Sequence, residues 1–211
     1  MNASGPPLLR AFGLSFARSD EAIFGPLDLE VFAAEALLVE GANGSGKTTL
    51  LRVLAGLLQP GSGRVEWSGR EEHRQIAATH VGLLGHLLGH KGELSCLENL
   101  QFVRGLHGSR PGADEAACLA EVGLAGYEDQ PARALSAGQR KRLALARLRL
   151  MPARLWLLDE PFANLDLQGI DLVNLLIERH LGDGGGALLT SHGAYATGAY
   201  RTRLLRLERP A

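Results

Sequence analysis

The sequence predicts an α/β domain with a helical insertion, and three observations predict this class. Short, nearly all-apolar runs, typical of strands covered on both faces, occur at residues 36–40, 155–158 and 187–190. Apolar residues at helical spacing follow the first two of these runs. From about residue 95 to residue 150 the pattern is helical throughout. Strands and helices therefore alternate on both sides of a helical block, which favours a sheet with an inserted helical region.

The segments before the block predict several more strands and one helix. Partial alternation of apolar and polar residues predicts strands over residues 8–16 and 27–31. Two further strands are expected over residues 63–67 and 80–84, and a helix over residues 47–58.

Within and after the block, capping residues and apolar spacing locate the remaining elements. Leu97, Leu100 and Val103 fit one helical face, and the residues from Cys118 to Val122 fit a second. Ser136 is a suitable N-cap for a long helix that ends near residue 150. A helix is also expected around residues 170–181, and a last strand over residues 204–207.

Composition limits the classes of function. The 211 residues, at 45% hydrophobic and 21% charged, are long enough for one domain with a real core and exclude wholesale disorder. A net charge of −1 disfavours a nucleic-acid binder held by bulk phosphate attraction. No apolar run approaches the roughly 20 residues that cross a bilayer, and residues 1–10 do not resemble a secretory signal. Cys96 and Cys118 form no CxxC pair and are expected to be free thiols in a reducing cytosol.

Residues 41–48 (GANGSGKT) match the phosphate-binding pattern G-x-x-x-x-G-K-[ST]. Glycines let successive backbone N–H groups converge on phosphate oxygens, and the following helix offers its positive N-terminus to the same anion. Lys47 would meet the β- and γ-phosphates, and Thr48 would join a Mg²⁺ shell. A plain glycine-rich turn is the alternative, but the strand before it and the helix after it favour nucleotide binding. The predicted nucleotide ligands here are Gly41, Asn43, Gly44, Ser45, Gly46, Lys47, Thr48 and Thr49.

Two carboxylates end the apolar strand at residues 155–158. Parallel strands present functional groups at their carboxyl ends, so Asp159 is placed to hold Mg²⁺ and Glu160 to polarise an attacking water. The alternative is that Asp-Glu-Pro merely ends a strand, but the phosphate loop upstream favours the functional interpretation. His192, at the end of another apolar strand, becomes a candidate partner for the γ-phosphate.

Residues 135–139 (LSAGQ) resemble the LSGGQ signature of the ABC transporter ATPases, with Ala137 in place of the first glycine. The resemblance spans about residues 8–207 and implies a P-loop NTPase core of the RecA type with an antiparallel β edge. It divides one ABC ATPase domain into a nucleotide-binding core, residues 1–85 and 151–211, and a helical subdomain, residues 86–150. In that family the signature faces the γ-phosphate held by a second subunit, which implies a homodimer on ATP binding. Ser136, Gly138, Gln139 and Asp166 would then contact nucleotide across the dimer, and His192 resembles the family's switch histidine.

Two positions depart from the family pattern. By its spacing to Ser95, His86 occupies the place of the family's Q-loop glutamine. An imidazole can accept from a metal-bound water or ligate Mg²⁺ weakly, so His86 is a candidate for both tasks. The position that stacks on adenine falls near Arg18, with Phe16 close by, and a guanidinium can also stack on a base.

Within the family, the Gly85–His86 pair, the short chain and LSAGQ resemble the ATP-binding subunit of the haem exporter of cytochrome c maturation. This resemblance implies an ATPase that uses ATP and Mg²⁺ and drives separate integral membrane permease subunits through a groove at residues 86–98. It would lie peripherally on the cytoplasmic face of the inner membrane, touch the membrane through its partner only and bind no nucleic acid. The alternatives are another exporter ATPase, for drugs or lipids, a soluble non-transport ABC ATPase in assembly or translation, and a catalytically silent nucleotide-binding module.

Overall fold

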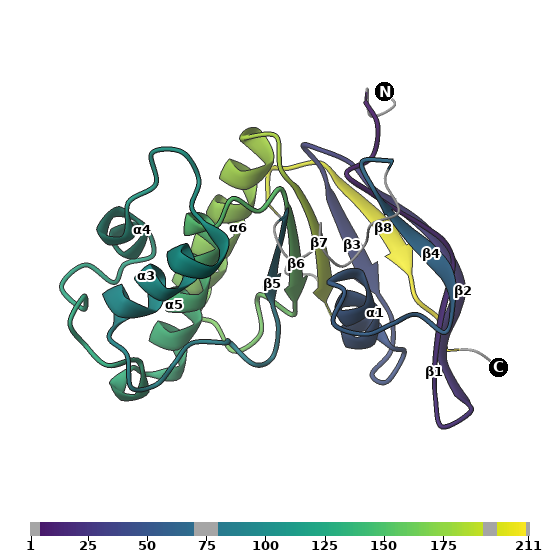
Figure 1. Ribbon diagram of the computed structural model, residues 1–211, viewed down its shortest axis with the longest axis horizontal. Helices are drawn as coiled ribbons and strands as arrows, with labels where there is room; N and C mark the ends of the chain where they lie inside the picture. Colours follow the sequence, from purple (N-terminus) through teal and green to yellow (C-terminus); the bar gives the residue numbers. More distant parts are fainter. Residues whose placement is uncertain (1–4, 70–79, 192–197, 210–211) are drawn as a thin grey trace.

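The computed structural model describes residues 5–69, 80–191 and 198–209, and shows two sheets beside a helical block (Figure 1). The central sheet is parallel, with the strand order β5-β6-β7-β3-β8. Its strands are β3 (Ala36–Glu40), β5 (Val81–Leu84), β6 (Leu155–Asp159), β7 (Gly186–Ser191) and β8 (Thr202–Arg206). Each of these five strands overlaps a run over which the sequence predicts a strand, and the α/β class is confirmed.

A second, antiparallel sheet has the order β2-β1-β4, and it is the predicted antiparallel edge. Its strands are β1 (Leu9–Arg18), β2 (Glu21–Val31) and β4 (Ser62–Trp67). The predicted strand over residues 27–31 was too short, because β2 starts at Glu21 and continues through Gly25 and Pro26. At Gly25 a Cβ would lie 2.3 Å from the carbonyl oxygen of Leu14, so the close approach of β1 and β2 requires glycine there.

The helical block consists of α3 (Cys96–His107), α4 (Glu115–Glu121) and α5 (Ala137–Leu150). Ser95 and Ser136 begin α3 and α5, and each hydroxyl accepts from the backbone N–H three residues on, in a complete capping box. The predicted N-cap at Ser136 is therefore confirmed. The helix α1 (Lys47–Leu54) is shorter than expected, because Gly56 takes a left-handed conformation (φ 72°) after its end. The last helix is α6 (Leu167–Gly182).

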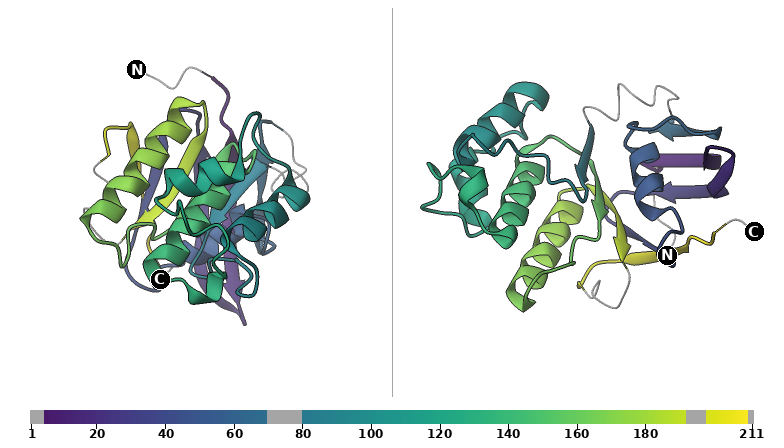
Figure 2. Two further views of the ribbon diagram at one scale, coloured as in Figure 1. Left: turned by 90° about the vertical axis from the view of Figure 1, so that its left-hand side faces the viewer. Right: turned by 90° about the horizontal axis from the view of Figure 1, so that it is seen from below.

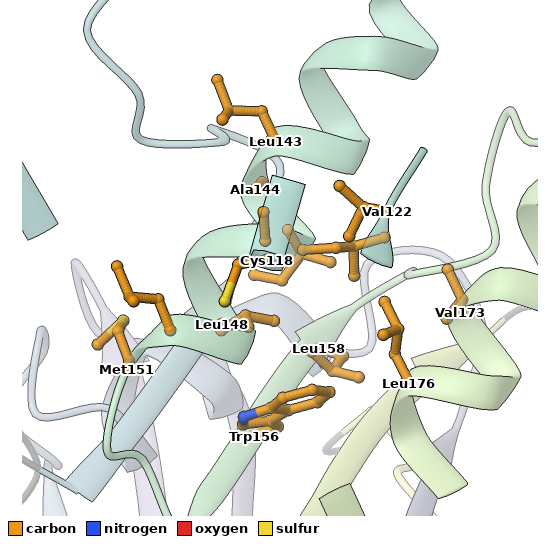
Figure 3. Packing of buried hydrophobic residues seen from close by; sticks show 14 of the residues in the cluster. Cys118, Val122, Leu143, Ala144, Leu148, Met151, Trp156, Leu158, Val173 and Leu176 are labelled. Carbon is orange, nitrogen blue, oxygen red and sulfur yellow. The ribbon is translucent and has the colours of Figure 1, made fainter. Parts of the chain in front are cut away.

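Alternate residues of the central strands supply two separate cores. On β6, Trp156 and Leu158 belong to the core shared with the helical block and α6 (Figure 3), whereas Leu155 and Leu157 belong to the core shared with α1 and the antiparallel sheet. The sheet therefore lies between two layers, with α1 on one face and α5 on the other, as Figure 2 shows. Burial on both faces explains why these strands are almost wholly apolar.

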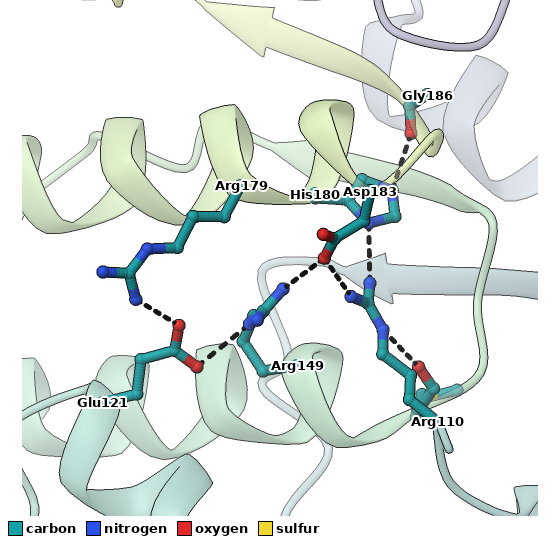
Figure 4. Close-up of polar contacts among 8 residues, drawn as sticks. Arg110, Glu121, Arg149, Arg179, His180, Asp183 and Gly186 are labelled. Atoms are coloured by element: carbon teal, nitrogen blue, oxygen red, sulfur yellow. Dashed lines mark hydrogen bonds and ion pairs between the residues drawn. The ribbon is translucent and has the colours of Figure 1, made fainter. Parts of the chain in front are cut away.

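A network of charged side chains joins the helical block to α6 (Figure 4). Glu121 accepts from Arg149 (Oε2···Nε 3.0 Å) and from Arg179 (Oε1···Nη1 2.7 Å), and Asp183 lies 3.2 Å from Nη1 of Arg110. Burial alone would raise the pKa of Glu121, yet the hydrogen bonds and charges of Arg149 and Arg179 hold that pKa below its ordinary value. The network connects α4 and α5 with α6 by contacts that are mostly half-buried.

His180 is the buried member of this network. Its ring stacks on Trp156 with centroids 4.0 Å apart and planes 6° apart. Burial, followed by the charge of Arg110, lowers the pKa of His180 to about 3, so the ring is neutral at ordinary pH. A guanidinium only donates, so Nδ1 accepts from Nη2 of Arg110 (2.7 Å), and Nε2–H donates to the carbonyl of Gly186 (3.1 Å).

Both cysteines are free and buried, as expected. Among the described helices, none combines the length and the apolar character that a membrane crossing requires.

Candidate nucleotide site

The glycine-rich loop at residues 41–46 leaves β3 and enters α1. Gly46 is the N-cap of α1 with φ 94°, and a Cβ there would lie 3.0 Å from Cγ2 of Ile23. A Cβ on Gly41 would lie 2.4 Å from the carbonyl oxygen of Leu207. Side chains are therefore excluded at both ends of the loop, and the loop leads directly into the N-terminus of α1, where backbone N–H groups favour an anion.

Lys47 is the first residue of α1, and its side chain turns back over the loop. Its Nζ donates to the carbonyls of Gly41 (2.7 Å) and Ala42 (3.0 Å), and the residue is only 6% exposed. An ammonium has three protons, so these two contacts leave one donor for a further acceptor. The charge is thus fixed over the loop in the position that an anion beside the N–H groups would meet.

A chain of hydrogen bonds joins α1 to the carboxyl ends of β6 and β7. Thr48 donates to Oδ2 of Asp159 (2.8 Å), and Thr190 donates to the other carboxylate oxygen, Oδ1 (2.8 Å). The backbone N–H of Glu160 in turn donates to Oγ1 of Thr190 (2.9 Å). Asp159 is therefore held by two hydroxyls beside Lys47 and the loop, and the two predicted metal-binding side chains, Thr48 and Asp159, are in direct contact.

Thr190 is a site residue that the sequence analysis did not identify. It lies opposite Asp159 in the register of β6 and β7 and is fully buried. The available signal was a polar residue at the end of an otherwise apolar strand. That signal does not reveal how β6 and β7 are paired, and it is this pairing that brings the Thr190 hydroxyl to Asp159.

Glu160 is half-buried and has a positive φ of 48°. Lys141 of α5 donates to its carbonyl oxygen (3.3 Å) and to that of Ala163 (2.8 Å). Burial lowers the pKa of Lys141 to about 8, against the charge of Glu160, which raises it. Lys141 is a second residue that sequence reasoning missed, because only the packing of α5 against the turn after β6 reveals it.

The signature residues form the first turn of α5. Ser136 accepts from the backbone N–H of Gln139 (3.2 Å), and the Gln139 side chain accepts from the backbone N–H of Ser136 (2.9 Å). Ser136 and Ala137 are exposed, and a Cβ on Gly138 would meet nothing within 4 Å. This turn is therefore an open surface, and the alanine that replaces the first glycine of the signature fits it without a clash.

The remaining predicted site residues lie around the same edge or away from it. His86 is exposed and follows β5, whose end pairs with β6 at Leu158, so it lies at the carboxyl edge of the sheet. Arg18 is exposed at the end of β1, opposite Glu21. Asp166 caps α6 by accepting from the N–H of Gly169 (2.8 Å). His192 lies outside the described residues.

The described residues hold no cluster of three or more His, Cys, Asp and Glu side chains that could bind a metal by itself. The oxygen donors present are the Thr48 hydroxyl and the Asp159 carboxylate. Mg²⁺ commonly binds to one or two protein oxygens and completes its shell with phosphates and water, so this donor set fits Mg²⁺ together with a nucleotide.

Residues 24–163 match the family model described as "ABC transporter". The chain belongs to the ABC transporter family. The matched region contains the glycine-rich loop, the signature turn and the carboxylates after β6, so the ABC ATPase fold is confirmed.

The curated relatives share almost the whole chain. The "Cytochrome c biogenesis ATP-binding export protein CcmA" of Xanthomonas oryzae pv. oryzae is 59% identical over 99% of this chain and 97% of its own. A protein of the same name from Xanthomonas axonopodis pv. citri is 60% identical over 97% of this chain and 96% of its own. The chain therefore groups with the CcmA proteins within the family.

Solved structures agree at the level of the fold. One described as "Structure of ATP binding subunit of ABC transporter" has a TM-score of 0.82 at 21% identity, covering 95% of this chain and 88% of its own. The dimeric structure of MJ0796, a bacterial ABC transporter cassette, has a TM-score of 0.81 at 20% identity, covering 95% and 94%. The protein is thus an ATP-binding subunit of the ABC transporter type and an ATPase that acts in transport.

Proposed function

We propose that this chain is the ATP-hydrolysing subunit of the haem export system of cytochrome c maturation and that it drives separate membrane permease subunits. The observation that carries the hydrolytic role is the hydrogen-bonded chain Thr48–Asp159–Thr190–Glu160 beside the loop that Lys47 covers. The identity to proteins named for cytochrome c biogenesis export, at 59% over nearly the full length, supports the transport role. The division into a core and a helical subdomain at residues 86–150 is part of the same proposal.

The triphosphate would lie on the glycine-rich loop. The loop's N–H groups and the N-terminus of α1 favour an anion, and Lys47 brings a positive charge to the same place. The proposed ligands are those that the sequence predicts, Gly41, Asn43 to Gly46, and Lys47 to Thr49. Thr48 and Asp159 would hold Mg²⁺, which supplies charge neutralisation at the β- and γ-phosphates when bound.

Glu160 would act on the attacking water. Glu160 directly follows Asp159, the proposed metal ligand. The Thr190 hydroxyl holds both residues, because it accepts from the backbone N–H of Glu160 and donates to the carboxylate of Asp159. A carboxylate there can orient the water and take its proton as the γ-phosphoryl group is transferred and ADP leaves. His192 and His86 are proposed to assist at the γ-phosphate and at the water shell of the metal, and Arg18 to stack on the adenine.

A complete site would need a second copy of the chain. α5, which begins at the signature turn, packs on the opposite face of the central sheet from α1, which begins at the phosphate loop. The exposure of Ser136 favours contact with the nucleotide of a partner subunit, together with Gly138, Gln139 and Asp166. This arrangement supports a homodimer that closes on ATP and opens after hydrolysis.

The permease would dock near the end of β5. Leu87 is 86% exposed directly after His86, and Phe102 and Leu106 on α3 are exposed to 42% and 63%. Exposed large apolar side chains are available for a protein contact when they form a patch. In this proposal the chain lies on the cytoplasmic face of the inner membrane, in contact with the bilayer through its partner only.

The test replaces Glu160 with Gln. Glu160→Gln keeps the size of the side chain but replaces the basic carboxylate by a neutral amide, so ATP turnover should fall by about a hundredfold or more while nucleotide still binds. Undiminished hydrolysis would contradict the role of Glu160.

Co-purification from detergent-solubilised membranes separates the transport role from a soluble one, because a subunit of an exporter should bring down membrane proteins.

A further inference from the structure

Lys141 links the signature helix to the turn that carries Glu160. It is the fifth residue of α5, which begins directly after the Ser136 cap. Its ammonium donates to the carbonyl oxygens of Glu160 (3.3 Å) and Ala163 (2.8 Å), both in the turn after β6. A flexible surface lysine would keep its charge in water, whereas this one is half-buried and ends on two backbone carbonyls.

The turn that Lys141 contacts has an uncommon backbone. Glu160 and Asn164 both have positive φ, at 48° and 58°. Non-glycine residues keep such a conformation only where the surrounding contacts determine it. The N–H of Glu160 donates to Thr190, and its carbonyl accepts from the N–H of Ala163 (3.1 Å) and from Lys141. The N–H of Glu160 is therefore held by β7, and its carbonyl is held by α5.

We propose that Lys141 is a positioning residue that sets the direction of the Glu160 carboxylate. The inference rests on the proposed function of Glu160. The peptide plane between Glu160 and Pro161 carries the carbonyl that Lys141 contacts, and rotating that plane turns ψ of Glu160 and the turn that follows. Without the ammonium, the carbonyls of Glu160 and Ala163 lose their shared donor, and the turn has more freedom to carry the carboxylate away from the water.

The contact also connects two parts of the proposed dimeric site. Ser136 and Lys141 lie five residues apart on one rigid helix, so a displacement of the signature turn also displaces the ammonium. When nucleotide held by the partner subunit contacts Ser136 and displaces the signature turn, the Glu160 turn of the same chain is therefore displaced as well. The catalytic carboxylate of one site is in this way made sensitive to nucleotide in the other.

The test compares variants of the full-length protein. Lys141→Met removes the donor and keeps the length, and we expect kcat for ATP hydrolysis to fall by about tenfold, as for lost positioning of a catalytic group. KM and the affinity for a fluorescent ATP analogue should stay within about twofold, because no ligand of the phosphates changes. Lys141→Arg, which keeps a cationic donor, should recover most of kcat.

The matched control is Arg142→Met on the same helix. Arg142 also donates to a backbone carbonyl, that of Val122 (2.8 Å), but inside the helical block and away from Glu160. We expect its kcat to stay near that of the wild type. If Lys141→Met does not fold, Lys141→Ala serves the same comparison, because water can then reach the two carbonyls.

The outcomes separate this inference from the proposed function. Normal kcat in a folded Lys141→Met or Lys141→Ala variant, with Glu160→Gln inactive, would overturn the role of Lys141 alone. The role of Lys141 would also be overturned if Arg142→Met lost as much kcat as Lys141→Met, or if Lys141→Arg did not recover the activity. Full activity of Glu160→Gln would instead remove the proposed function on which the inference rests.

Discussion

At the scale of single residues, the Thr190 hydroxyl joins the two carboxylate-bearing residues at the carboxyl end of β6. The hydroxyl donates to Asp159 and accepts from the N–H of Glu160, and Thr190 is fully buried. Thr190→Val keeps the shape but leaves the N–H of Glu160 and Oδ1 of Asp159 without this partner, which should cost about 1–3 kcal/mol in the free energy of unfolding. ATP turnover should fall by about tenfold or more, because the carboxylate of Asp159 and the backbone of Glu160 lose the hydroxyl that holds both. Denaturant unfolding and saturating ATPase rates check both effects.

The control for this prediction is Thr190→Ser, which retains the hydroxyl and should keep most of the activity. Wild-type turnover in Thr190→Val would show that the hydrogen-bonded chain is not needed for catalysis. A loss of activity in the serine variant as large as in the valine variant would point to packing instead.

His180 provides a prediction about pH. Its pKa is lowered to about 3 by burial, then by the charge of Arg110, whereas in the unfolded chain it returns to its ordinary range near 6.5. Below pH 6.5 the unfolded chain therefore binds a proton that the folded chain does not, so this group lowers the free energy of unfolding as the pH falls from 6.5 toward 3. His180→Phe removes the titration and keeps an aromatic ring against Trp156.

The measurement is the free energy of unfolding of both proteins between pH 4 and pH 7. The free energy of unfolding should depend less steeply on pH in His180→Phe, by the equivalent of up to about one bound proton. Its stability at pH 7 should nevertheless be lower, because Arg110 and Gly186 lose a hydrogen-bond partner. Equal slopes in the two proteins would contradict a neutral buried His180.

At the scale of elements, Glu121 connects α4 to the neighbouring helices through Arg149 on α5 and Arg179 on α6. Arg149 is only 16% exposed, so its charge is poorly screened once the carboxylate is neutralised. Glu121→Gln should lower the free energy of unfolding by about 1–3 kcal/mol, as expected when a partly buried ion pair loses one charge. Thermal or denaturant unfolding measures the change.

The control is the exposed pair of Arg133 and Glu93, with side chains 67% and 78% exposed. Glu93→Gln should change the stability by less than about 0.5 kcal/mol, because water screens such pairs. If both variants behaved alike, the network of Figure 4 would be no stronger than a surface contact.

The elements also show how far the sequence predicts this molecule. The strands of the parallel sheet and the Ser136 cap could be predicted, because burial on both faces and capping leave a local pattern in the chain. The full length of β2 could not, since Gly25 and Pro26 interrupt its alternation while its pairing with β1 continues. Thr190 and Lys141 were missed for a related reason. Their partners at Asp159 and Glu160 come from strand register and helix packing, which sequence spacing does not contain.

At the scale of the whole molecule, the two halves of the proposed site lie on helices that pack against opposite faces of one sheet. α1 carries Lys47 on one face, and α5 begins at Ser136 and packs on the other (Figure 1). A single chain would then supply the phosphate loop of one site and the signature turn of another. Two chains arranged head to tail would complete two sites at once.

This arrangement predicts that hydrolysis by the purified chain depends on its concentration. Specific ATPase activity should rise as dimers form and level off when the dimer is saturated, because only the dimer has complete sites. Ser136→Arg, which places a bulky cation on the exposed signature turn, should abolish the rise without changing the binding of a fluorescent ATP analogue to the monomer. The measurement is specific activity over protein concentrations below and above the micromolar range, beside sedimentation of the Glu160→Gln variant with ATP. Constant specific activity in a protein that sediments as a monomer would show that one chain hydrolyses ATP alone, and the shared site would be wrong.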